Sequence, residues 1–245
     1  MDFQDRRVWI TGASSGIGEA LALAFHQAGA KLILSARRED ELKRVQAACA
    51  GEPNTRILPL DVTNAAELAE KTRLALSLFN GIDVLVLNAG ITQRSRTRET
   101  DESVYRRLME VNFFAPEAMA RAVLPSMLAQ KSGHIAVISS VAGKFGVPLR
   151  SGYSATKFAL HGFFEALRAE EGRNGVHITM VCPATFVQTS ACLRFEGTAA
   201  STPKWILNSP MECPPMSVPA KSCKASQKRR KRLLLPLLEK KPSSI

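Results

Sequence analysis

The chain has two tyrosines, and the second of them, Tyr153, stands four residues before Lys157. On a helix, residues four positions apart share one face, so the phenol and the ammonium are expected to lie close together. A phenol is a weak acid at neutral pH, and a neighbouring ammonium stabilises its phenolate. Such a pair can exchange a proton with an oxygen whose carbon exchanges hydride with a nicotinamide. The spacing also arises by chance on amphipathic helices, so its meaning depends on its surroundings.

A serine stands shortly before this pair, at the end of an apolar run. The segment His134–Ser140 is predicted to be a strand, and it ends with two serines. Active sites of α/β proteins form at the carboxyl ends of parallel strands. We therefore expect Ser140 to donate a hydrogen bond to the substrate oxygen.

A glycine-rich turn follows the first predicted strand, with the sequence Thr11-Gly12-Ala13-Ser14-Ser15-Gly16-Ile17-Gly18. Gly12 permits a tight turn, Gly16 lets the backbone approach a phosphate, and Gly18 lets helix and strand pack closely. The helix that follows offers unpaired N–H groups and a positive dipole end to an anion. The position of this turn between a strand and a helix predicts dinucleotide binding. The residues expected to hold the cofactor here are Gly12, Ser14, Ser15, Gly16, Ile17 and Gly18.

The end of the second predicted strand indicates which dinucleotide binds. A carboxylate there would hold the ribose 2′-hydroxyl of NAD(H), whereas a basic residue accommodates the extra phosphate of NADP(H). Ala36 leaves that acidic position empty, and Arg37 and Arg38 follow it. The segment favours NADP(H) over NAD(H), with Arg37 at the phosphate. The alternative is that both arginines only solvate the start of a helix.

Short apolar runs alternate with helical patterns along the chain, which is typical of βαβ units. This order predicts an α/β fold with a single Rossmann-type, doubly wound parallel sheet and helices on both faces. The expected strands are Arg7–Thr11, Lys31–Ser35, Arg56–Leu60, Ile82–Asn88, His134–Ser140 and Val176–Cys182. The expected helices cover residues 17–28, 38–50, 64–79, 101–130 and 152–172.

Taken together, these residues resemble the classical short-chain dehydrogenase/reductase family, over residues 5–190. The segments Gly133–Gly146 and His161–Glu170 look like the branch that contains the 11β-hydroxysteroid dehydrogenases and their orphan relatives. The spacings from Asn112 to Ser140 and from there to Tyr153 are similar to those of the family. The motifs that carry the resemblance are the glycine turn, Asp61-Val62, Asn88-Ala89-Gly90, Asn112, Ser140 and Tyr153-x-x-x-Lys157.

The resemblance implies a catalytic tetrad. Tyr153 is the general acid and base, and Ser140 is the catalytic serine. Lys157 binds the nicotinamide ribose and stabilises the tyrosinate, and Asn112 holds a water of the proton relay. The remaining cofactor contacts that the resemblance implies are Asp61 and Val62 at the adenine, Asn88, Ala89 and Gly90 beside the adenosine ribose, and Pro183 and Thr189 in the segment over the nicotinamide.

Two positions depart from the family pattern, and a proline raises a question about the relay. Ala184 stands where a glycine usually follows Pro183, and Leu87 replaces the first asparagine before Ala89-Gly90. Pro116 has no N–H for the carbonyl of Asn112 if residues 101–130 form one helix. That carbonyl would then be free to hold the relay water. The alternative places Pro116 in the first turn of a separate helix.

The charge is concentrated near the end of the chain. Residues 221–245 hold nine lysines and arginines and one glutamate, and so +8 of the net charge of +11. A basic tail on a nearly neutral body argues against a nucleic-acid partner. Weak contact of this tail with a membrane surface is an alternative to a basic helix that leads into an edge strand. We expect residues 1–190 to form the dinucleotide-binding and catalytic domain, 191–220 a substrate loop or lid, and 221–245 a basic segment.

The other bulk features indicate an ordinary cytoplasmic protein. No apolar run is long enough to span a membrane, and the first residues do not resemble a signal peptide. The five cysteines show no spacing of a metal or redox motif, so we expect no metal.

The expected function is therefore NADP(H)-dependent interconversion of a carbonyl and a secondary alcohol on a hydrophobic small molecule of lipid, steroid or retinoid type. The apolar residues after Ser140 and the lid residues Trp205 and Ile206 favour such a substrate. The alternatives are a 3-ketoacyl-thioester reductase, which could use the arginines of residues 94–107, and a non-catalytic NADP-binding scaffold. The family also implies a homodimer or homotetramer through helices 101–130 and 152–172.

Overall fold

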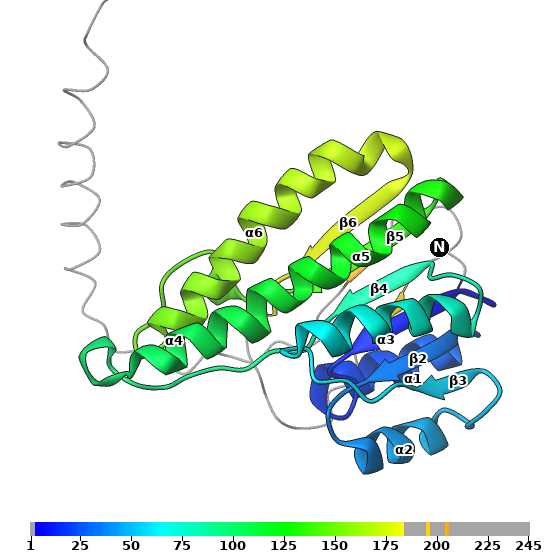
Figure 1. Ribbon diagram of the computed structural model, residues 1–245, viewed down its shortest axis with the longest axis horizontal. Coiled ribbons are helices and arrows are strands. Elements are labelled where there is room, and N and C mark those ends of the chain that lie inside the picture. Colours follow the sequence, from blue (N-terminus) through cyan, green and yellow to red (C-terminus); the bar gives the residue numbers. More distant parts are fainter. Residues whose placement is uncertain (1–2, 184–194, 197–203, 206–245) are drawn as a thin grey trace, which may run out of the picture. The chain divides into compact units, whose positions relative to one another are not determined.

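The computed structural model describes residues 3–183, 195–196 and 204–205. Strands and helices alternate along it, as the sequence predicts (Figure 1). The strands of the main sheet are β1 (Arg7–Thr11), β2 (Lys31–Ser35), β3 (Thr55–Ile57), β4 (Val84–Leu87), β5 (Gly133–Ile138) and β6 (Val176–Val181). The α-helices are α1 (Gly16–Gln27), α2 (Glu39–Ala48), α3 (Ala65–Leu78), α4 (Glu102–Met109), α5 (Ala115–Gln130) and α6 (Ser151–Glu171).

The six strands form one parallel sheet in the order β3-β2-β1-β4-β5-β6. The order reverses between β1 and β4, and in such sheets the ligand binds beyond the carboxyl ends of the strands at that point. The predicted Rossmann-type α/β fold is confirmed.

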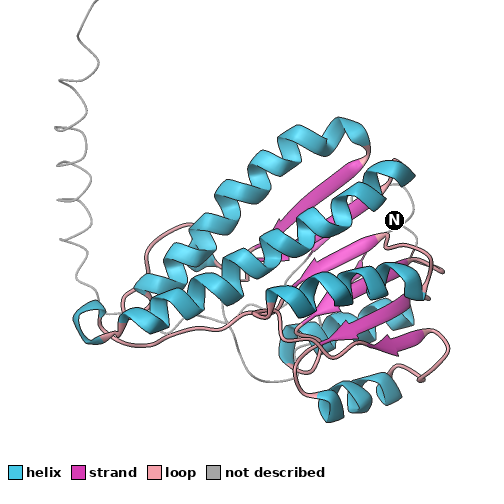
Figure 2. Cartoon of the chain, in the orientation of Figure 1, coloured by secondary structure: helices cyan, strands magenta, loops and turns pink. Residues whose placement is uncertain are grey.

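Two apolar layers hold helices against the two faces of the sheet (Figure 2). Helices α3, α5 and α6 cover one face, where Trp9, Met119 and Phe164 are buried. Helices α1 and α2 cover the other, through residues such as Phe25 and Leu42. Strands that are covered on both faces are apolar on both faces. Apolar and polar residues therefore do not alternate within the predicted strands.

Most element ends lie within two residues of their predicted positions. The exception is β3, which ends three residues before the end of the predicted run Arg56–Leu60. Leu58 and Leu60 still donate backbone N–H bonds to carbonyls of the Leu34–Ala36 segment, so the chain stays against β2 as far as Asp61.

One predicted helix has a different internal structure. Residues 101–130 form α4, a π turn at Glu110–Phe114, and α5, without a break between them. The N–H of Ala115 donates to the carbonyl of Glu110, five residues back. Pro116 is the second residue of α5 and lies inside this continuous helix, so it supplies no N–H to the carbonyls one turn before it. Pro116 therefore does not begin a separate helix, and the hydrogen-bond register changes just before the proline.

Little of the chain after Pro183 belongs to the described part. A two-residue strand, Phe195–Glu196, pairs antiparallel with Lys204–Trp205. The rest of the predicted lid, residues 191–220, and the basic segment 221–245 lie outside the described residues. None of the helices in the described part of the chain is long and apolar enough to cross a membrane.

Gly162 offers a test of the helical assignment of α6. It lies in the interior of that helix, it is exposed, and a Cβ atom there would meet no atom within 4 Å. Glycine is about 1 kcal/mol less favourable than alanine inside a helix. Gly162→Ala should therefore raise the free energy of unfolding by up to about 1 kcal/mol, measured by urea unfolding. A lower unfolding midpoint would contradict the assignment.

Candidate active site

The glycine turn after β1 has the close contacts expected of a dinucleotide cradle. Gly12 has a φ of +64°, a conformation that L side chains rarely adopt. A Cβ atom on Gly18 would lie 2.1 Å from the carbonyl oxygen of Gly12, so only glycine lets α1 approach β1 this closely. The backbone is thereby shaped to approach a phosphate at the start of α1.

Two side chains tie this turn to the end of β4. The Asn88 amide Nδ2 donates to the carbonyls of Thr11 at 3.0 Å and Gly12 at 3.1 Å. The Thr11 hydroxyl accepts the N–H groups of Asn88 and Ala89 at 3.0 and 3.1 Å. The predicted Asn88-Ala89-Gly90 segment thus lies against the predicted glycine turn. Leu87 is the last residue of β4 and is 3% exposed, and its side chain packs in the hydrophobic core.

The start of α1 is suited to an anion. Its N-cap residue Ser15 makes no side-chain cap hydrogen bond, so the side chain does not occupy the first N–H groups of the helix. Glu19 lies in this first turn, and Arg44 of α2 pairs with it at 2.7 Å and reaches the Ser14 carbonyl at 3.4 Å. Arg44 thereby offsets the carboxylate beside the site. These residues fit a dinucleotide phosphate.

The two residues predicted to flank the adenosine lie at neighbouring strand ends. Arg37 is exposed and forms no ion pair among the described residues. Asp61 accepts the N–H and the hydroxyl of Thr63 on one oxygen, Oδ1, at 3.0 and 2.8 Å. These bonds, with the nearby Arg107 and Arg37, lower the pKa of Asp61. It is therefore an ionised acceptor with Oδ2 unpartnered in the described part of the chain.

Lys157 is an almost fully buried cation, with 5% of its surface exposed. Its Nζ donates to the carbonyl of Ile138, the last residue of β5, at 2.8 Å. Burial lowers the pKa of Lys157 to about 8, and the Cys182 sulfur partly opposes this shift. A Cβ atom on Gly90 would lie 3.9 Å from this Nζ, so the ammonium faces the Asn88-Ala89-Gly90 segment.

Tyr153 and Lys157 share one face of α6, as predicted. The Tyr153 ring is 6% exposed, and both Lys157 Nζ and the Arg150 guanidinium lie 5.7 Å from its centre. Two cations thus flank the ring of the predicted acid–base residue.

Ser140 lies at the carboxyl edge of the sheet, two residues beyond the carbonyl that Lys157 contacts. It caps a short helical turn, Val141–Gly143, by accepting the Ala142 N–H at 3.2 Å. The structure therefore places the predicted serine, tyrosine and lysine around one edge of the sheet.

The Asn112 side chain makes three hydrogen bonds within the protein. Its Oδ1 accepts the N–H of Ile91, and its Nδ2 donates to the Ile91 carbonyl and to the Thr156 hydroxyl. Both amide hydrogens are therefore used, and the side chain joins the loop after β4 to α6. A water held by Asn112, as the family implies, could donate to the second lone pair of Oδ1 or to the backbone carbonyl, which lies in the π turn.

Sequence inspection missed one positioning residue, Gln93. It is buried, and its Oε1 accepts the backbone N–H of Tyr153 at 2.9 Å. Arg150, the N-cap of α6, makes no side-chain cap bond, so Gln93 supplies one from a distant loop. Local capping patterns cannot reveal a partner 60 residues away in the sequence.

Of the two residues predicted to lie near the nicotinamide, Pro183 belongs to the described part of the chain and Thr189 does not. The Pro183 carbonyl accepts the N–H of Val141 at 3.3 Å, which ties the end of β6 to the turn after Ser140. Thr189 and the departure at Ala184 lie outside the described residues.

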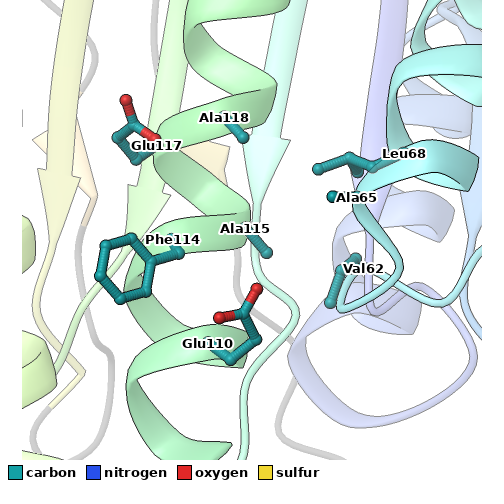
Figure 3. Close-up of a pocket in the computed structure, with 8 residues that line it drawn as sticks. All are labelled: Val62, Ala65, Leu68, Glu110, Phe114, Ala115, Glu117 and Ala118. Atoms are coloured by element: carbon teal, nitrogen blue, oxygen red, sulfur yellow. The ribbon is translucent and has the colours of Figure 1, made fainter. Parts of the chain in front are cut away.

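A pocket of about 370 Å³ lies between the start of α3 and the π turn, and Val62, predicted to contact the adenine, lines it (Figure 3). None of the four predicted catalytic residues lines it. Its lining is apolar apart from two carboxylates, and consists of Val62, Ala65, Leu68, Glu110, Phe114, Ala115, Glu117 and Ala118.

The close approach at Gly18 predicts a loss of cofactor affinity on substitution. Gly18→Ala places a methyl group on the Gly12 carbonyl, so the turn must move away from the phosphate. The dissociation constant for NADPH, measured by fluorescence titration, should rise about tenfold or more, equal to ~1.4 kcal/mol. Gly162→Ala is the matched control and should bind as the wild type does. Unchanged binding by Gly18→Ala would show that this approach does not shape the cradle.

The burial of Lys157 predicts a pH-dependent stability. Its pKa of about 8 in the folded chain lies below the ordinary value of 10.5. Between these values the unfolded chain binds a proton that the folded chain has lost, so the free energy of unfolding rises with pH. Relative to Lys157→Met, the wild type should gain up to about 3 kcal/mol between about pH 7 and pH 10. Urea unfolding of the cofactor-free proteins measures this difference, and a constant difference would contradict it.

Comparisons with known proteins agree with this geometry. The chain is 44% identical over 202 residues to "Dehydrogenase/reductase SDR family protein 7-like" of Anopheles gambiae, covering 79% of this chain and 63% of that protein. It is 42% identical over 188 residues to the human "Dehydrogenase/reductase SDR family member 7", covering 74% and 56%. The chain therefore spans less than two thirds of the length of either relative. Their names fit the predicted orphan branch.

Solved structures show the same fold. A short-chain dehydrogenase from Streptomyces avermitilis superposes with a TM-score of 0.73 at 36% identity, covering 76% of this chain and 68% of that one. A metagenomic short-chain oxidoreductase in complex with NADP gives 0.71 at 30% identity, covering 76% and 85%.

The model of the family "short chain dehydrogenase" matches residues 6–194. That range includes the glycine turn and all four members of the predicted tetrad, so the chain belongs to the short-chain dehydrogenase family.

Proposed function

We propose that this protein is an NADP(H)-dependent oxidoreductase that interconverts a carbonyl and a secondary alcohol on a hydrophobic small molecule. The observation that carries the proposal is the buried Lys157 beside Tyr153, at the sheet edge that also holds the dinucleotide turn. A buried ammonium is costly, and perturbed groups of this kind cluster at functional sites. The names of the relatives, dehydrogenase/reductase, support the same reaction class.

The residues of the chain divide the chemistry among them. A bound nicotinamide would supply or accept the hydride. Tyr153 gives its phenolic proton to the substrate oxygen during reduction and takes a proton from the alcohol during oxidation. Ser140 donates a hydrogen bond to the same oxygen, and Lys157 stabilises the tyrosinate with its positive charge.

The preference for NADP(H) rests on charge at the end of β2. Arg37 has no carboxylate partner among the described residues, whereas Arg44, beside the glycine turn, is paired with Glu19 and Glu41. Arginine is suited to phosphate because its planar group donates several hydrogen bonds. The solved relative in complex with NADP supports this choice.

A hydrophobic substrate of lipid, steroid or retinoid type is supported by apolar side chains after Ser140. Phe145 is 58% exposed and Leu149 is 42% exposed, and both lie between the turn that Ser140 begins and the start of α6. Exposed apolar groups at the edge of a site favour an apolar ligand. Trp205 lies in the short strand Lys204–Trp205, and Ile206 lies outside the described residues.

The ketoacyl-thioester alternative is less well supported. Of the arginines in residues 94–107, Arg98 and Arg106 pair with Glu99 and Glu102, and Arg107 donates to Thr63. These contacts are those of solvated surface charges.

Three further points stay predictions. Residence in the cytoplasm is one, and weak contact of residues 221–245 with a membrane surface is another. A homodimer or homotetramer through α4, α5 and α6 is the third, and it is supported by Phe114 in the π turn and Phe158 on α6, which are 48% and 46% exposed.

The test is turnover of a panel of carbonyl compounds with NADPH and with NADH. A steroid or retinoid ketone should be reduced to a secondary alcohol, with NADPH preferred. Tyr153→Phe should lower kcat by about 10²–10⁴-fold while the dissociation constant for NADPH stays unchanged, because only the proton donor is removed.

Tyr105→Phe is the matched control, because Tyr105 is the other tyrosine and its hydroxyl contacts Ser151 and Thr97 on the surface. It should retain wild-type kcat. Turnover only of ketoacyl thioesters would favour the reductase alternative, and NADPH binding without any turnover would favour the scaffold. Full activity of Tyr153→Phe would overturn the assignment of the acid–base residue.

A further inference from the structure

A buried histidine lies one helical turn beyond Lys157 and two turns beyond Tyr153. His161 shares their face of α6, and it is 7% exposed. The reaction proposed above gives it no role. Its ring nevertheless contacts residues at the carboxyl ends of both β5 and β6.

The ring nitrogen Nε2 faces the ends of two strands. It lies 3.2 Å from the hydroxyl of Ser139, the residue directly before Ser140, and 3.5 Å from the Cys182 sulfur at the end of β6. Ser139 is 1% exposed. The histidine therefore links the catalytic helix to the carboxyl ends of β5 and β6.

The other nitrogen, Nδ1, faces two charged side chains. The Glu165 carboxylate lies 3.1 Å from it and the Lys144 ammonium lies 3.2 Å from it, while these two charges are 3.7 Å apart. An imidazole Nδ1 donates to the carboxylate or accepts from the ammonium. In the first case Nε2 accepts from Ser139, and in the second it donates to Ser139, because a hydroxyl can do either. The link to Ser139 is therefore made in both tautomers.

The turn after Ser140 packs against the same ring without spare room. A Cβ atom on Gly143 would lie 2.9 Å from the Ser139 hydroxyl, 2.9 Å from the Lys157 carbonyl and 3.0 Å from His161 Cδ2. The turn Val141–Gly143 is thus seated on the helix between Lys157 and His161.

We propose that His161 is a positioning residue, which sets Ser140 relative to Tyr153 and Lys157 by holding Ser139 against α6. Three successive residues at the end of β5 are involved. The Ile138 carbonyl accepts from Lys157, the Ser139 hydroxyl bonds to His161, and Ser140 begins the turn. Side chains of an extended chain alternate in direction, and Ser140 has an extended backbone, so fixing Ser139 fixes the direction of Ser140.

This inference rests on the proposed function for its effect on catalysis, but its structural part can be tested separately. Four variants test the contribution of each group in the link between His161 and Ser139. His161→Leu removes both nitrogens, and Ser139→Ala removes the partner hydroxyl. His161→Gln places an amide near the position of Nε2, and His161→Asn places one near Nδ1.

The matched control is His134→Leu. His134 lies at the opposite end of β5 and makes the same kind of bond, from Nε2 to the Thr179 hydroxyl of β6 at 2.8 Å. It links the same two strands far from the active-site edge.

Two measurements are made on each full-length variant. Hydrogen exchange of the amides of residues 141–145 reports how firmly the turn after Ser140 is held, and it requires no turnover. We expect exchange about tenfold faster in His161→Leu, His161→Asn and Ser139→Ala, and wild-type exchange in His161→Gln and His134→Leu. The second measurement is kcat with NADPH, which should fall about tenfold or more in the same three variants and recover in His161→Gln. The dissociation constant for NADPH should not change.

The outcomes separate this proposal from the proposed function. Wild-type exchange in Ser139→Ala and His161→Asn overturns the positioning role, and so does an equal loss in His134→Leu. If His161→Leu does not fold, the Gln and Asn variants decide between the two ring nitrogens. If the wild type turns over no carbonyl but the exchange pattern holds, the positioning role stands and the proposed function fails.

Discussion

The burial of a single ammonium group organises the active-site edge of this protein. Lys157 would lose hydration inside the domain, and one backbone carbonyl, that of Ile138, accepts from it. That bond requires the end of β5 to lie directly beside α6. The segment after β4 also lies close to this site, because a Cβ atom on Gly90 would be 3.3 Å from Asn112 Oδ1 and 3.9 Å from Lys157 Nζ. The positions of the catalytic groups thus follow from where a buried cation can be accommodated.

Hydrogen bonds between side chains and backbone hold the loops around that cation. Thr11 and Asn88 join the ends of β1 and β4, Asn112 joins the loop after β4 to α6, and Gln93 caps the start of α6. Each of these bonds connects segments that are far apart in the sequence. Together they bring the segments after β1 and β4 and the start of α6 to one edge, where the proposed chemistry needs groups held within a fraction of an ångström.

The helix that carries Asn112 shows how such a site departs from regular structure. A π turn at Glu110–Phe114 shifts the hydrogen-bond register just before Pro116. Bulges of this kind are frequent at functional sites, because they free or redirect a backbone group. Here the side chain of Asn112 serves as a brace, and its backbone lies where the register changes.

Most of the fold could be predicted from the sequence because its signals are local. Apolar runs of strand length, helical periodicity and a glycine turn after the first strand depend on neighbouring residues, and β1 and β2 have the predicted ends. The residues of the proposed tetrad could also be named, because the family's spacing along the chain is itself the signal. The π turn could not, since Pro116 is compatible with either a kinked helix or a new one.

The sequence by itself therefore determined the order of the elements, the fold class and which side chains are proposed for the chemistry. All three depend on short-range patterns along the chain. Only the tertiary structure decided how these groups are supported. Gln93 and His161 have no local pattern, because their partners lie 60 residues away in one case and on β5 and β6 in the other. Long-range packing chooses such partners, since a buried polar group must find whichever donor or acceptor the fold brings within reach.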